Sequence, residues 1–303
     1  MPTQDSIPTL SFDSILTQYR ESLKWLDSLG VNYQHGRVCK YLRIFEEWNR
    51  SYKTATSEDA KNSYPAFIYS IQEMWDFISI YEAFKLTPTS ELSGIITKLK
   101  DGVKGPENLF DETPKSTRAR NFIFEAVMAA KTHKPTRHCS AILDAETDTG
   151  IRFEKSSVWV ECKRVTTEKK IEKNVREASK QLQHAISKKV GSNHRGLVAL
   201  DVSKILNNGD RIFVASDSTS LLYEIDLMMD RFIREHSHIW QKIITSKSPK
   251  ILGVIIKYDF MASSDTEGLV SRCCQWAINP RNQISPRDSE FLHKLTAVLK
   301  DSD

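Results

Sequence analysis

The sequence lacks several features that would assign it to a membrane, secreted or nucleotide-hydrolysing class. Its strongest continuous apolar run, residues 251–256, is far shorter than the roughly 20 residues that a helix needs to cross a bilayer. The opening MPTQDSIPTL has no basic stretch followed by an apolar run, so no secretory signal is expected. No GxxxxGK[ST] phosphate-binding loop is present. We therefore expect a cytoplasmic protein without a membrane partner.

Cysteine is also scarce and irregularly placed. The chain has 5 cysteines, an odd number without regular spacing, which argues against a disulfide framework and suits a reducing compartment. Hydrophobic residues make up 40% and charged residues 27%, as in ordinary globular proteins. With 303 residues, the chain is long enough for two domains and at least one sizeable core.

The first part of the chain has the pattern of helices. Apolar residues recur at three- and four-residue spacing in a segment that Pro65 is expected to open, which is typical of an amphipathic helix. Gly, Pro, Asn and Asp then gather in residues 101–115, a composition typical of a linker. We predict an all-helical N-terminal domain over residues 1–110 and a second domain over residues 111–303.

The second part alternates helices with short extended segments. A helix over residues 116–131 precedes three extended segments, and a long helix follows over roughly Glu168–Lys189. Further strands and helices alternate from there to the end of the chain. The pattern predicts an α/β (α+β) fold in which helices flank a mixed sheet.

The segment VWVECK ends an apolar run with a carboxylate and an ammonium. Side chains alternate between the two faces of a strand, so Glu161 and Lys163 share one face while Cys162 points to the other. This assigns Cys162 to packing. A cross-strand ion pair on a solvated face is the alternative interpretation of Glu161 and Lys163.

The preceding strand is expected to form a hairpin with this one. We predict a turn at Ser156–Ser157, which places Arg152 opposite Glu161 and puts Asp148 on the same face. In that register Asp148 lies about 13 Å along the sheet from Glu161, at about 3.3 Å per residue. A shared site would then need the chain to bend near Gly150.

Two carboxylates within reach of each other form a hard oxygen site suited to Mg²⁺. A neighbouring lysine can orient or activate a water molecule and stabilise charge that builds up on a phosphate. The combination of Asp148, Glu161 and Lys163 therefore indicates hydrolysis of phosphodiesters.

These residues resemble the PD-(D/E)xK, or restriction-endonuclease-like, nuclease superfamily over roughly residues 116–205. The resemblance includes Asp148, the later Glu161-Cys162-Lys163, and Glu125 on the helix before the strands. The family's usual proline before the aspartate is replaced by Thr147. This leaves the choice of acid open between three residues, with the first favoured by spacing: Asp148, Glu146 and Asp144.

The resemblance implies a restriction-endonuclease-like fold and a metal-dependent nuclease. Asp148 and Glu161 would bind Mg²⁺ or Mn²⁺, Lys163 would position or activate the attacking water, and Glu125 would support the metal or its water shell. DNA is the favoured substrate. The alternative is a catalytically inactive nuclease fold that binds nucleic acid or acts as a regulatory subunit. The sequence leaves the oligomeric state open, with a dimer among the options.

The helix after the strands carries a basic stripe opposite its apolar face. Within residues 161–195 there are 10 basic and 4 acidic residues. The stripe would suit a phosphate backbone, although a solvated face with internal salt bridges explains it equally well. Related nucleases often carry a glutamine on this helix, which adds Gln181. The predicted nucleic-acid contacts are Lys169, Lys173, Arg176, Lys180 and Gln181.

Overall fold

A sheet of seven strands forms the centre of the computed structural model, which describes residues 11–51, 54, 56–109, 111–113, 116–145, 147–207, 212–264 and 269–300. The strand order is β1-β2-β3-β4-β6-β5, and β7 also pairs with β6. The strands are β1 Cys139–Ile142, β2 Thr149–Phe153, β3 Ser156–Arg164, β4 His194–Asp201, β5 Phe213–Ala215, β6 Ile251–Ser264 and β7 Leu269–Pro280.

The sheet is mixed, as the sequence pattern predicts. Strands β1, β2 and β3 are antiparallel neighbours, while β3, β4 and β6 run parallel to one another. Strand β5 runs parallel to the end of β6, and β7 runs antiparallel along β6. The carboxyl ends of β3 and β4 therefore lie side by side, close to Lys163, while β6 continues past them to Ser264.

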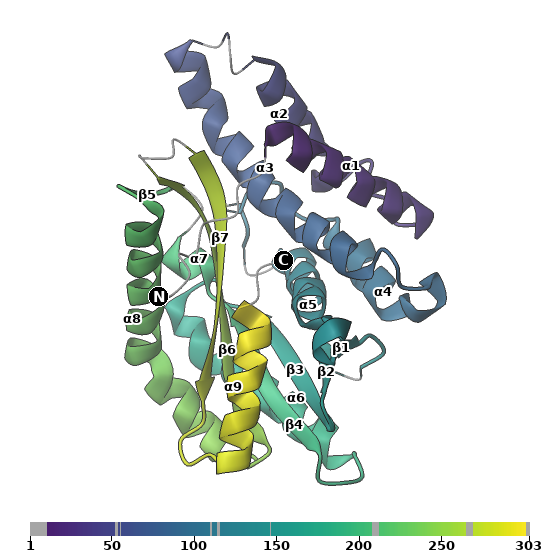
Figure 1. The fold of residues 1–303 in the computed structure, drawn as a ribbon, viewed down its shortest axis with the longest axis vertical. Coiled ribbons are helices and arrows are strands. Elements are labelled where there is room, and N and C mark those ends of the chain that lie inside the picture. Colours follow the sequence, from purple (N-terminus) through teal and green to yellow (C-terminus); the bar gives the residue numbers. More distant parts are fainter. Residues whose placement is uncertain are drawn as a thin grey trace.

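Helices cover both faces of the sheet (Figure 1). Helices α6 and α8 bury their apolar faces against one side, where Trp159 packs with Val175 and Leu182. Helices α5 and α9 cover the other side, where Val160 lies in the same core as Val127. The helices are α1 Phe12–Ser28, α2 Arg37–Ser51, α3 Ser57–Phe84, α4 Ser93–Gly102, α5 Arg118–Thr132, α6 Ile171–Ser187, α7 Ser203–Leu206, α8 Ser218–Thr245 and α9 Pro286–Lys300.

The N-terminal part is helical in its described residues: α3 and α4 pack against α5, and α1 and α2 pack on α3 (Figure 1). Helix α3 begins at Ser57, so the prediction that Pro65 opens it is wrong. Proline lacks one backbone donor but fixes a φ angle that suits a helix, and this helix continues through it. Among the described residues, none of the helices has the length and hydropathy of a membrane span.

One buried apolar cluster joins the N-terminal helices to the sheet. It contains Leu23 from α1, Leu99 from α4, Val160 from β3 and Leu295 from α9. The segment between α4 and α5 has no helix or strand in its described residues, in agreement with the composition of residues 101–115. The division into domains at residue 110 stays a prediction.

In the hairpin of β2 and β3, each residue of β2 pairs with a β3 residue four positions earlier than predicted. Its turn is Glu154–Lys155, with Glu154 at a φ of 51°, and Ser156 and Ser157 already belong to β3. Arg152 therefore pairs with Ser157, so the predicted pairing of Arg152 with Glu161 is wrong. Thr149 pairs with Val160, and the preceding Asp148 consequently comes opposite Glu161. No bend at Gly150 is needed to bring the two acids together.

A glycine in α4 allows this helix to approach the connection between β1 and β2. A Cβ atom at Gly94 would lie 1.8 Å from the backbone oxygen of Leu143. We expect Gly94→Ala to lower the free energy of unfolding by about 1–3 kcal/mol, because backbone atoms must move apart. Denaturant unfolding would measure this, with the exposed neighbour Ser93→Ala as the control. Equal stability of the two variants would contradict the close approach.

Candidate active site

Asp148, Glu161 and Lys163 meet where β2 begins and β3 approaches its end. The Nζ atom of Lys163 lies 3.2 Å from Oδ2 of Asp148 and 3.1 Å from Oε2 of Glu161. The backbone N–H of Cys162 donates a hydrogen bond of 2.8 Å to the same Oδ2 of Asp148. One ammonium group is thus shared by two carboxylates on neighbouring strands.

Burial distinguishes this group from a surface ion pair. Glu161 is only 3% exposed, so the alternative of a solvated cross-strand pair does not hold for it. Burial, and then the nearby Asp148 carboxylate, raise the pKa of Glu161 to about 7, although Lys163 acts in the opposite direction. The site therefore carries more negative charge than the single lysine ammonium neutralises.

Lys163 itself stays protonated. Burial opposes its charge, but the Asp148 and Glu161 carboxylates outweigh burial and raise its pKa above the ordinary value. Its side chain is 19% exposed, so the ammonium can still meet a ligand from outside. Lys163 is consequently a hydrogen-bond donor and a fixed positive charge at neutral pH, and not a base.

Glu125 lies close to this group but is paired with a different lysine. It is 6% exposed and forms an ion pair with Lys98 of α4. Burial, and then the charge of Asp148, raise the pKa of Glu125 to about 7, and Lys98 partly counteracts them. Asp148 is therefore the electrostatic neighbour that Glu125 and Glu161 have in common.

Three further residues were considered for this site from the sequence: Cys162, Asp144 and Glu146. Cys162 is buried on the opposite face, and burial raises the pKa of its thiol well above the ordinary value, which suits packing. Asp144 is exposed, while Asp148 contacts Lys163 directly. Glu146 lies outside the described residues.

A buried ion-pair network fixes the end of β3 beside the candidate site. Arg164 donates to Oε1 of Glu112 at 2.7 Å and to Oδ2 of Asp201 at 3.2 Å. Asp201 also accepts hydrogen bonds from the backbone N–H and the hydroxyl of Ser203. Since Arg164 directly follows Lys163, this network restricts where the Lys163 ammonium can lie.

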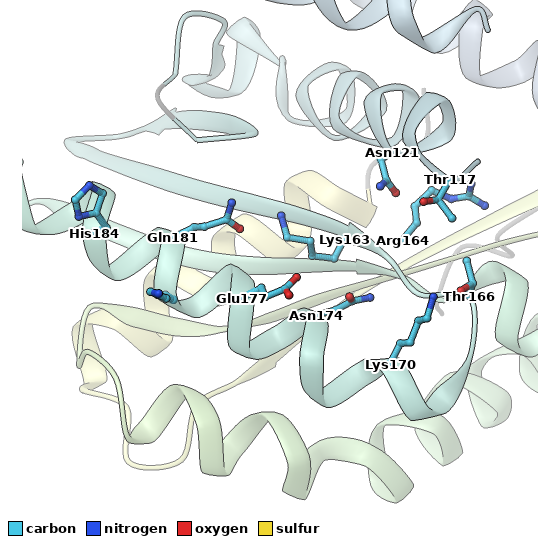
Figure 2. A pocket seen from close by; sticks show the side chains of 11 residues that line it. Thr117, Asn121, Lys163, Arg164, Thr166, Lys170, Asn174, Glu177, Gln181 and His184 are labelled. Carbon is cyan, nitrogen blue, oxygen red and sulfur yellow. The ribbon is translucent and has the colours of Figure 1, made fainter. Parts of the chain in front are cut away.

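A polar cavity of about 720 Å³ opens next to Lys163 (Figure 2). Thr117 and Asn121 of α5 line one side of it, and Lys163 and Arg164 of β3 line its floor. The remaining side is one face of α6 and the segment before it, with polar and charged side chains: Thr166, Lys170, Asn174, Glu177, Lys180, Gln181 and His184.

Two of the predicted nucleic-acid contacts, Lys180 and Gln181, line this cavity. Lys173 and Arg176 are exposed and pair with Glu177 and Glu172 on the same helix, as expected for a solvated face. Lys169, also exposed, precedes α6. The cavity therefore lies against only one edge of the predicted basic stripe, where Lys180 is, and Lys173 and Arg176 do not line it.

Comparison of the chain with protein-family models, curated proteins and solved structures finds no significant match. Within the described part of the chain, there is no group of three or more His, Cys, Asp or Glu side chains that could hold a metal ion. The two carboxylates that meet at the Lys163 ammonium, those of Asp148 and Glu161, are the candidate metal ligands here.

Sequence reasoning missed Lys98 and two amides of the cavity, Asn121 and Asn174. Lys98 lies on α4, outside the segment that carries the resemblance, and no local pattern marks it. The amides were detectable in principle. Asn121 precedes Glu125 by one helical turn, and Asn174 precedes Gln181 by two turns, so each shares a helix face with a predicted site residue.

The pairing of Lys98 with Glu125 gives a pH-dependent expectation. Lys98→Met should lower the free energy of unfolding by about 2 kcal/mol near pH 8, where Glu125 is ionised and loses its counter-charge. The loss should be much smaller near pH 5, because Glu125, with a pKa of about 7, is then protonated. Denaturant unfolding at both pH values would measure this.

The matched control is Lys100→Met, since Lys100 is exposed on the same helix. It should change stability little at either pH. A Lys98→Met loss that is equal at both pH values would contradict an ionic contribution from Glu125.

Proposed function

We propose that this protein is a metal-dependent phosphodiesterase, with DNA as the favoured substrate. The observation that carries the proposal is the convergence of the Asp148 and Glu161 carboxylates on the Lys163 ammonium, next to a polar cavity. The sequence resemblance to PD-(D/E)xK nucleases, with a restriction-endonuclease-like fold, supports the same conclusion. It assigns the same three residues to metal binding and water positioning.

The donor set fits Mg²⁺ or Mn²⁺. Magnesium is commonly held by one or two carboxylates, with water and substrate phosphate completing its coordination, so two acids suffice. The pKa of Glu161, raised to about 7, also indicates that another positive charge would be favourable there. Asp148 and Glu161 would hold the ion, and Glu125 would support its water shell. When bound, the ion would polarise the phosphate and lower the pKa of a water molecule.

The side chains of this protein have separate roles in the proposal. Lys163, kept protonated by its acidic neighbours, orients the attacking water by donating a hydrogen bond and stabilises negative charge on the phosphate. Asp148 is held by the Cys162 backbone N–H, which fixes its carboxylate relative to β3. The Arg164 network anchors the strand end that carries Lys163.

A cleavage assay tests the proposal. The purified protein would be incubated with plasmid, linear and single-stranded DNA, with Mg²⁺, with Mn²⁺ or with EDTA. We expect cleavage of at least one substrate with metal and none with EDTA. Absence of cleavage on every substrate would reject the hydrolytic function. Salt-dependent DNA binding in that case would support the alternative, an inactive nuclease-like fold that binds nucleic acid.

A further inference from the structure

Two residues that line the cavity beside Lys163 each carry a buried polar atom that lacks a hydrogen-bond partner. Oδ1 of Asn121 and Oγ1 of Thr166 are both inaccessible to solvent, and neither has a hydrogen-bond partner within the described residues. Buried polar atoms in proteins are nearly always satisfied. Both residues line the cavity through their other atoms, so a bound ligand would pair with these two oxygens only after the side chains rotate toward it.

Amide side chains face each other across this space. Asn121 comes from α5, while Asn174 and Gln181 come from the facing side of α6 (Figure 2). Each amide offers a donor and an acceptor side by side. This is the pattern with which proteins bind the hydrogen-bonding edge of a nucleobase.

The charges of the cavity favour an anion. Lys170 and Lys180 line it, and neither forms an ion pair with a described residue. Lys163 also lines the cavity, but Asp148 and Glu161 share its charge, so the balance rests on Lys170 and Lys180 against the acidic side chain of Glu177. A ligand that combines phosphate with a polar planar group would satisfy both the lysines and the amides.

We infer that this cavity binds one unstacked nucleotide, with its phosphate toward the lysines and its base between the amides. The inference rests on the proposed function for the choice of ligand. The cavity volume of about 720 Å³ lies within the range of about 300–1,000 Å³ that is typical of sites for small ligands. A base inside a duplex cannot enter such a site unless it leaves the stack. The substrate class is therefore single-stranded DNA, or DNA with an unpaired nucleotide.

Binding without metal tests this inference separately from cleavage. A fluorescently labelled short single-stranded oligodeoxynucleotide would be compared with its duplex by anisotropy in EDTA. We expect the single strand to bind about tenfold more tightly, as one good base contact allows. Gln181→Ala and Asn174→Ala should each remove most of this preference.

The matched control is Gln183→Ala. Gln183 is exposed on α6 like Gln181, but it does not line the cavity, so the preference should persist. Equal binding of single strand and duplex by the unmodified protein, or equal effects of Gln181→Ala and Gln183→Ala, would overturn the inference. Cleavage without single-strand preference would overturn the nucleotide site alone. Preference without metal-dependent cleavage would retain the nucleotide site and reject hydrolysis.

Discussion

Lys163→Ala is expected to lower the rate of metal-dependent DNA cleavage by about 10²–10⁴-fold, the usual contribution of a positioned catalytic group. The side chain lies 3.2 Å or less from both candidate metal ligands and reaches the cavity. Its removal deletes the ammonium that orients water and stabilises the phosphate. Initial cleavage rates at saturating Mg²⁺ would measure the effect.

The Mg²⁺ affinity of Lys163→Ala distinguishes a catalytic role of Lys163 from a structural one. Its ammonium competes with a metal ion for the same two carboxylates, so Lys163→Ala should bind Mg²⁺ at least as tightly as the unmodified protein. Calorimetric titration with Mg²⁺ would measure this. A parallel loss of cleavage and metal binding would instead indicate that the substitution disrupts the site.

Lys155→Ala is the matched control for this substitution. Lys155 is an exposed residue in the turn of the same hairpin, remote from the carboxylates in the pairing of β2 with β3. Its replacement should leave the cleavage rate unchanged. A similar loss of activity in both variants would mean that the hairpin as a whole, and not the Lys163 ammonium, is required.

The register of this hairpin illustrates what the sequence could determine. Alternation correctly predicted which face each side chain occupies, including the separation of Cys162 from Glu161 and Lys163. A shift of four residues preserves every one of those assignments, because the strand period is two. The turn can then be chosen only from local composition, and the two serines indicate a turn two residues too late. The position of Asp148 opposite Glu161 follows from the observed pairing of β2 with β3.

The contribution of the N-terminal helices could not be predicted in the same way. The strands and helices of residues 116–300 follow from local periodicity, and most lie close to their predicted positions. The contact of Lys98 with Glu125 joins residues from different parts of the fold, and it depends on how α4 packs. Gly94, one turn before Lys98, allows this packing, but a glycine within a helical pattern does not identify its neighbour.

Glu161→Gln should have opposite effects on stability and metal binding. The pKa of Glu161 is raised from an ordinary 4.5 to about 7, so the folded protein binds this proton more tightly than the unfolded chain. The stability that protonation contributes is present below about pH 4.5 and is lost as the pH rises through about 7. Near pH 8 the ionised side chain costs on the order of 3 kcal/mol, which glutamine avoids.

Urea unfolding near pH 5 and pH 8 would reveal this difference. Glu161→Gln should gain stability relative to the unmodified protein as the pH rises, by up to about 3 kcal/mol. The exposed Glu47→Gln is the control and should show no such change. An equal stability difference at both pH values would contradict the buried, ionisable state of Glu161.

Added Mg²⁺ should reverse the order of stability near pH 8. A ligand at about 100 times its Kd stabilises the folded state by about 2.7 kcal/mol, so the unmodified protein should gain about that amount. Glu161→Gln should gain little, because it lacks one of the two carboxylates that would hold the ion. An equal gain in both proteins would exclude Glu161 as a metal ligand. The buried acid would thus destabilise the metal-free protein for the same reason that it attracts a divalent cation.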